Sequence, residues 1–177
     1  SSTSRGLGDV YKRQALSGRK PTGQTRQYSW SLTGPVVREH TGLSVTLDGS
    51  QSIDHQSVHA ATPGGIFSTL VSQPSTALGL WANLDHRISS EQAVRVEFRQ
   101  RTDRARNQGI GQFDLPERSF STTSHGGEFR LAHHATTGRG YVNDLRFGLD
   151  WDRSDASSLV DARTMSVLDA FTSGGAQ

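Results

Sequence analysis

The sequence has no cysteine, no long apolar run and almost no excess of charge of either sign, and each absence excludes a class of protein. A chain of 177 residues without cysteine forms neither disulfide bonds nor thiol-based sites. No segment approaches the roughly 18 consecutive apolar residues of a transmembrane helix. The formal net charge is only +2, and the arginines are scattered rather than gathered in a patch, which gives no indication of nucleic-acid binding. Hydrophobic residues make up 32% of the chain, which is little for a domain that buries its own core.

A two-residue period is present instead, most clearly in residues 91–101, EQAVRVEFRQR. Val94, Val96 and Phe98 occupy even positions, whereas the odd positions between and after them are charged. Successive side chains of a β-strand point to opposite faces, so this pattern predicts a strand with one apolar and one charged face. Such a strand suits a soluble sheet with one face in water. It equally suits a membrane β-barrel, with lipid outside and a polar interior.

Five further segments alternate in the same way at regular spacing. We predict strands at residues 28–33, 43–48, 78–85, 91–101, 128–134 and 141–152. The connections are short at 38–40, 88–90 and 137–140, and long polar loops are predicted at 49–76, 102–126 and beyond 153. Short turns at one end and long loops at the other are typical of outer-membrane barrels. The predicted fold is all-β: an antiparallel up-and-down meander of about six strands, forming a partial transmembrane β-barrel with long loops on one side.

The last predicted strand has the length of a membrane crossing. Tyr141 and Trp151 lie at opposite ends of its apolar face. Ten residues tilted by about 45° rise roughly 23 Å, close to the apolar band of about 25 Å in such barrels. In a barrel the charged positions face the lumen. The residues predicted to do so are Arg95, Glu97, Arg99, Arg130, Arg146 and Asp150.

A soluble β-sandwich is the alternative fold, because its strands also alternate. It predicts that Val94, Val96 and Phe98 are buried beneath a second sheet. A sandwich seldom places every long connection at one end of its strands, so the alternation of loop lengths favours the barrel.

Residues 28–47, YSWSLTGPVVREHTGLSVTL, resemble the early barrel of TonB-dependent outer-membrane receptors. In that family a strand ending in Gly-Pro is followed by a basic residue and an alternating apolar strand. Residues 61–67, 78–86, 107–109 and 113–118 add further similarities, and the resemblance covers residues 18–177. Together these segments are most similar to the receptors that carry an N-terminal carboxypeptidase-regulatory-like domain.

The resemblance implies a barrel of about 22 strands around a plug, in the outer membrane of a Gram-negative cell. It implies import of a scarce, unknown small ligand, with outer-membrane lipid and the TonB complex as partners. Contact with the TonB complex would require an N-terminal region that is not recognisable in this chain. A passive outer-membrane porin and a soluble β-sandwich that binds carbohydrate are the alternative functions.

The first residues are expected to be foreign to the fold. DVYKRQ at residues 9–14 resembles a translated sequencing adapter, so residues 1–14 are predicted to be a disordered artefact and the chain a fragment. Residues 15–27 are predicted to be a loop that follows a missing plug, and residues 28–177 the partial barrel.

No pattern in the sequence indicates an enzyme, a cofactor or a metal site. His133 and His134 are adjacent on a predicted strand and therefore point to opposite faces, where they cannot chelate together. Neither a nucleophile elbow nor a phosphate-binding loop occurs. A ligand could bind at an extracellular loop tip, although a plain solvated loop is the simpler interpretation. The residues predicted for that ligand site are Phe113, Asp114, Glu117 and Arg118.

Overall fold

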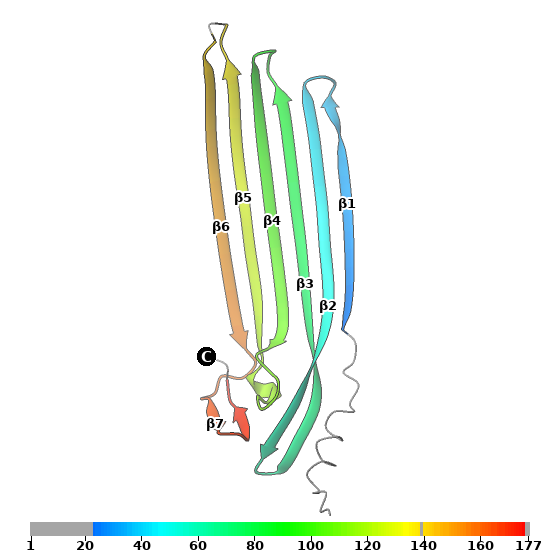
Figure 1. The fold of residues 1–177 in the computed structure, drawn as a ribbon, viewed down its shortest axis with the longest axis vertical. Helices are drawn as coiled ribbons and strands as arrows, with labels where there is room; N and C mark the ends of the chain where they lie inside the picture. The colour runs from blue at the N-terminus through cyan, green and yellow to red at the C-terminus, as the bar shows by residue number, and fades with distance from the viewer. Residues whose placement is uncertain (1–22, 139, 176–177) are drawn as a thin grey trace, which may run out of the picture.

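A computed structural model describes residues 23–138 and 140–175, and in these ranges the chain is all-β apart from one short 3-10 turn. Six strands form one antiparallel sheet in chain order (Figure 1): β1 (Gln24–Val37), β2 (Thr41–Thr62), β3 (Gly65–Arg87), β4 (Gln92–Gln108), β5 (Phe120–Thr136) and β6 (Val142–Ser158). The 3-10 turn is η1 (Pro116–Arg118), and β7 (Met165–Val167) pairs with β8 (Phe171–Ser173). The predicted all-β, six-stranded antiparallel meander is confirmed. Within the described ranges, no helix has the length and apolar character needed to span a bilayer.

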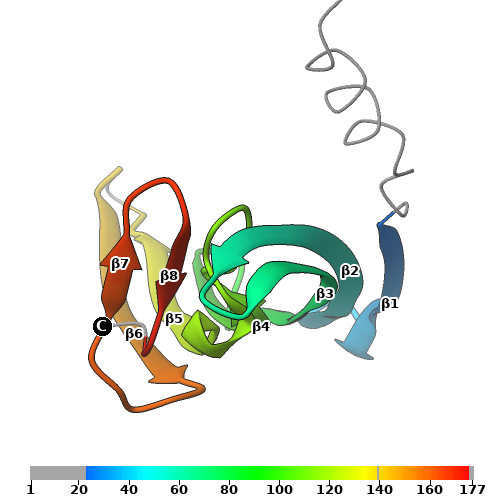
Figure 2. The same ribbon diagram turned by 90° about the horizontal axis from the view of Figure 1, so that it is seen from below.

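The connections differ in length between the two ends of the sheet (Figure 1). At one end β1–β2, β3–β4 and β5–β6 are joined by the short turns predicted at 38–40, 88–90 and 137–140. At the other end lie the β2–β3 hairpin tip, the segment 109–119 and the segment that carries β7 and β8 (Figure 2). We call these the short-turn end and the long-connection end.

The six strands of the large sheet are longer than predicted, at 14 to 23 residues. The prediction of a loop at 49–76 is wrong: β2 and β3 continue their ladder through this region to a two-residue turn at Pro63 and Gly64. The loop predicted at 102–126 shrinks to 109–119, β6 extends to Ser158, and residues 24–27 are strand rather than loop. Residues 1–22, which include the adapter-like segment, lie outside the described ranges.

One physical reason accounts for these corrections. Backbone pairing continues wherever two strands remain adjacent, but an amphipathic pattern exists only where the two faces meet different surroundings. Segments such as 49–62 have polar side chains on both faces, so the sequence shows no period there although the ladder persists. Pro74, which has no backbone N–H, lies just outside the β3–β4 ladder, which begins at Ser75.

The register places apolar side chains in rows that cross the whole sheet on one face, which we call the apolar face. The middle row is Leu32, Val45, Ala82, Phe98, Phe129 and Leu149. The row toward the short-turn end is Gly34, Leu43, Leu84, Val96, Leu131 and Phe147. The row toward the long-connection end is Trp30, Leu47, Leu80, Gln100, Gly127 and Trp151.

The buried residues lie mostly outside these rows, at the long-connection end. The β2–β3 hairpin extends beyond its neighbours and its tip bends across the end of the sheet (Figures 1 and 2). There His59 N donates to Gln112 O at 2.7 Å, and Ala61 N donates to Ala170 O at 3.1 Å. Val58 is fully buried and Phe171 is 8% exposed. The tip, the 109–119 segment and β8 thus form a small packed cap.

Candidate functional site

The candidate site is the face of the sheet opposite the apolar face, which we call the charged face. All six residues predicted to face a lumen lie on it, because cross-strand partners share a face. Arg95 pairs with Ala132, which pairs with Arg146. Glu97 pairs with Arg130. Arg99 pairs with Glu128, which pairs with Asp150.

Ion pairs join neighbouring strands across this face. Arg95 Nε lies 2.6 Å from Asp85 Oδ1, and both side chains are about half exposed. Glu128 contacts two arginines: Arg130 on its own strand and Arg99 on β4, whose Nη1 is 3.9 Å away. Exposed pairs of this kind contribute about 0–1 kcal/mol each, so they orient side chains more than they stabilise the sheet.

Further polar contacts lie at the two ends of this face. Nearer the long-connection end, Arg101 binds Asp103 of its own strand through two hydrogen bonds of 2.8 Å. At the short-turn end, His134 Nδ1 lies 2.7 Å from Asp144 Oδ1. The charged face therefore carries fixed charges along most of the length of β4–β6.

A tryptophan lies among these charges. Trp81 is on the charged face, opposite Arg99, and its buried indole N–H has no hydrogen-bond partner among the described residues. The side chains around it form an open hollow, lined on this face by Asp48, Trp81, Arg99, Arg101, Glu128 and Asp150. An aromatic ring beside cations and carboxylates can contact both the flat and the polar parts of a ligand.

The apolar face is uncovered in the described ranges. Trp30 is 53% exposed and Leu149 54%, and no side chain in its three central rows is buried. Ala135, which is 8% exposed, lies beyond those rows at the short-turn end. Val94, Val96 and Phe98 are only half-buried, and no second sheet formed by the described residues lies over them. The sandwich alternative predicted that these three residues would be buried, and the structure contradicts it.

Aromatic rings on the apolar face lie over glycines of the neighbouring strand. The ring of Tyr28 covers Gly49, and the ring of Trp151 covers Gly127, so closely that a Cβ at either glycine would overlap the ring. Trp151 also lies 6.1 Å from the ring of Phe98, centre to centre. These contacts fix the aromatic rings at the long-connection edge of the apolar rows.

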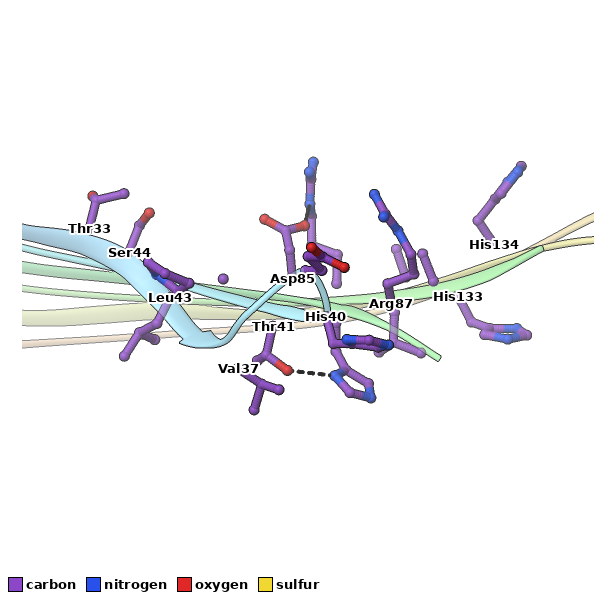
Figure 3. Close-up of a pocket in the computed structure, with 18 of the residues that line it drawn as sticks. Thr33, Val37, His40, Thr41, Leu43, Ser44, Asp85, Arg87, His133 and His134 are labelled. Carbon is purple, nitrogen blue, oxygen red and sulfur yellow. Dashed lines mark hydrogen bonds and ion pairs between the residues drawn. The ribbon is translucent and has the colours of Figure 1, made fainter. Parts of the chain in front are cut away.

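A hollow at the short-turn end is divided by the sheet itself. Figure 3 shows Thr33, Ser44 and His134 on one side of the strands, and Thr41 and His133 on the other. The adjacent histidines therefore point to opposite faces, as predicted. On the apolar side, Thr41 Oγ1 is 2.8 Å from His86 Nδ1. This hollow is the end of a sheet rather than an enclosed binding cavity.

The four residues predicted for an extracellular ligand site lie in the cap. Asp114 forms an ion pair of 3.2 Å with Arg118, and Glu117 Oε1 accepts hydrogen bonds from the Ser173 hydroxyl and from Gly174 N. Phe113 is 47% exposed. The Glu117 side chain thus holds β8 against the 109–119 segment, whereas the Asp114–Arg118 ion pair lies within that segment. The role of these residues toward a ligand stays a prediction.

The list of predicted lumen-facing residues left out Asp85, Glu128 and Trp81, although they complete the charged face. The position of the short turn at residues 88–90 predicts which residues of β3 and β4 lie opposite each other. Asp85 and Arg95 are equally far from residue 90, so a turn centred there places them opposite each other. Aligning each strand pair about its turn would therefore have found the Asp85–Arg95 ion pair.

Comparisons with models of protein families, with curated proteins and with solved structures gave no match to this chain. Among the described residues, no group of three or more His, Asp or Glu side chains is placed to hold a metal ion. The functional argument therefore depends on the two faces of the sheet.

Proposed function

We propose that this chain is part of the wall of an outer-membrane β-barrel, with its apolar face against lipid and its charged face toward a hydrated lumen. The observation that carries the proposal is the uncovered apolar face, whose rows cross all six strands. A soluble protein seldom exposes so large an apolar patch, whereas a membrane barrel requires one.

The dimensions of the apolar face support a membrane location. On β3 the apolar face runs from Leu78 through Ala82 to His86, which is about 26 Å along the strand and about 19 Å at a tilt of 45°. The lipid-facing band of an outer-membrane barrel is about 25 Å tall, so the apolar face spans most of it but not its full height. Aromatic residues bound such bands, and here Tyr28, Trp30 and Trp151 lie along the long-connection edge.

The edges of the sheet support the inference that the complete barrel has more strands than these six. Strands β1 and β6 each have one side unpaired within the described ranges. Open edges invite aggregation, and a barrel removes them by closing on itself. We infer that further strands would pair with β1 and β6 in a complete barrel wall.

We propose a TonB-dependent receptor as the kind of barrel, on the resemblance in residues 28–47 and the segments that follow. Its function would be import of a scarce ligand, with the charged face lining the route. A passive porin would share the two-faced sheet. An intact gene that encodes a plug and a TonB-contacting segment upstream of β1 would support the receptor, and one that encodes neither would leave the porin.

Membrane insertion is tested by refolding the chain from urea with and without phosphatidylcholine vesicles. The proposal predicts that the chain aggregates in water and gains protease-resistant strands with vesicles. A monodisperse protein that unfolds cooperatively in water without lipid would contradict it.

A further inference from the structure

Basic side chains gather on the apolar side of the sheet at its long-connection end, in the outermost apolar row and in the row beyond it. We propose that Arg26, Arg104 and Arg153 form a belt that binds the phosphates of anionic lipid headgroups. This inference rests on the proposed membrane location and adds a lipid partner to it.

The register puts all three arginines on the same side as the apolar rows. Arg153 follows Trp151 by two residues on β6 and shares a row with Tyr28 and Leu78. Arg26 and Arg104 lie in the next row, on β1 and β4. All three are exposed. The Arg153 side chain is 76% exposed, although its guanidinium also pairs with Asp155 on the same strand at 2.9 Å.

The distances match the depth of the phosphate layer. Successive rows on one face are two residues apart, or about 7 Å along a strand. The three arginines therefore lie within about 7–14 Å of the row that holds Trp30 and Trp151. The polar layer of a bilayer extends roughly 5–8 Å beyond each edge of its hydrocarbon core, and strand tilt brings the arginines closer to that range.

The net positive charge is specific to the apolar side of the sheet and to its long-connection end. Asp155 is the one acidic residue in the two arginine rows, so three arginines against one aspartate leave a net charge of +2. On the charged face, the corresponding rows hold Asp48, Asp103 and Asp152 against Arg101. At the short-turn edge, the last row of the apolar face is Thr41, His86, Val94, His133 and Leu145. Basic charge thus faces outward where anionic headgroups would lie.

The test compares binding of the whole chain to phosphatidylcholine vesicles with and without phosphatidylglycerol, measured by vesicle flotation. Each arginine near an anionic surface strengthens binding about five-fold, so two net charges predict a preference of about 25-fold. The variant R26Q/R104Q/R153Q should lose most of this preference while it still binds pure phosphatidylcholine. The control R101Q/R130Q/R146Q removes the same number of charges from the opposite face and should keep the preference.

Other outcomes would overturn the inference. Equal losses in both triple variants would show that net charge alone attracts the chain to the vesicles. If inorganic phosphate displaces the chain from the vesicles more than chloride does at equal ionic strength, the arginines bind a free anion instead of a lipid. If the outward triple variant still inserts into phosphatidylcholine but the wild type shows no anionic preference, the belt is refuted and the proposed membrane location stands. Failure of every variant to bind any vesicle would refute both.

Discussion

Replacing Ala82 with arginine puts a charge at the centre of the apolar face without removing a large side chain. Ala82 lies midway along β3 between Leu78 and His86, about 13 Å from either limit of the apolar rows. Its neighbours across the ladders are Val45 and Phe98, neither of which can pair with a cation. The new guanidinium would therefore lie near the middle of the hydrocarbon.

An arginine at the bilayer midplane of a barrel wall destabilises it by about 2–4 kcal/mol, and one near the interface by about 0–1 kcal/mol. The larger range corresponds to a roughly 30-fold to 1,000-fold fall in the folding equilibrium constant in vesicles. We expect the lower half of this range, because the open edges of the chain let water and headgroups approach the charge.

Two controls lie on the same strand. Asn83→Arg places the cation on the charged face, opposite Glu97, and should change stability by less than about 1 kcal/mol. His86→Arg keeps it on the apolar face but at the short-turn edge, where the cost is about 0–1 kcal/mol. Urea titration of the chain refolded into phosphatidylcholine vesicles, followed by protease resistance, measures all three variants. Equal stability of Ala82→Arg and Asn83→Arg would refute the assignment of the apolar face to lipid.

Three further predictions concern local contacts. Gly127→Val should destabilise the sheet by about 1–3 kcal/mol in a urea titration, because the new side chain would displace the Trp151 ring. Gly148→Ala is the control: its methyl group would enter open space and should have little effect on stability. Asp85→Asn breaks the exposed ion pair to β4 and should lower stability by at most about 1 kcal/mol in the same assay; a larger loss would show that the pair is not solvated. Glu117→Ala removes the acceptor for β8, so hydrogen exchange should accelerate in residues 159–175 and not in β4 or β5; unchanged exchange would show that this carboxylate does not hold the cap.

The sequence predicts the sheet best where its two faces differ. Val94, Val96 and Phe98 alternate with charged residues, and this part of β4 is a strand with the predicted faces. The three short turns were also predicted, because each lies between two amphipathic runs. Together the turns and the alternation determine the meander and the face on which Arg95 lies.

The cap could not be predicted from local pattern. The ladder between Asp54 and Gln73 has polar side chains on both strands, so no period marks it as strand. Val58 is buried only because Gln112 and β8, both distant in sequence, pack against the hairpin tip. The roles of Asp114 and Glu117 in holding β8 likewise depend on long-range contacts that a loop sequence does not reveal.

The most direct test of the two-faced wall uses its three tryptophans. Trp30 and Trp151 lie on the apolar face, and Trp81 lies on the charged face. Three single-tryptophan variants, with the other two replaced by phenylalanine, are refolded into vesicles whose acyl chains carry bromine, which quenches indole fluorescence on contact. We predict strong quenching of Trp30 and Trp151 and little quenching of Trp81. Equal quenching of all three, or quenching of Trp81 alone, would contradict the account.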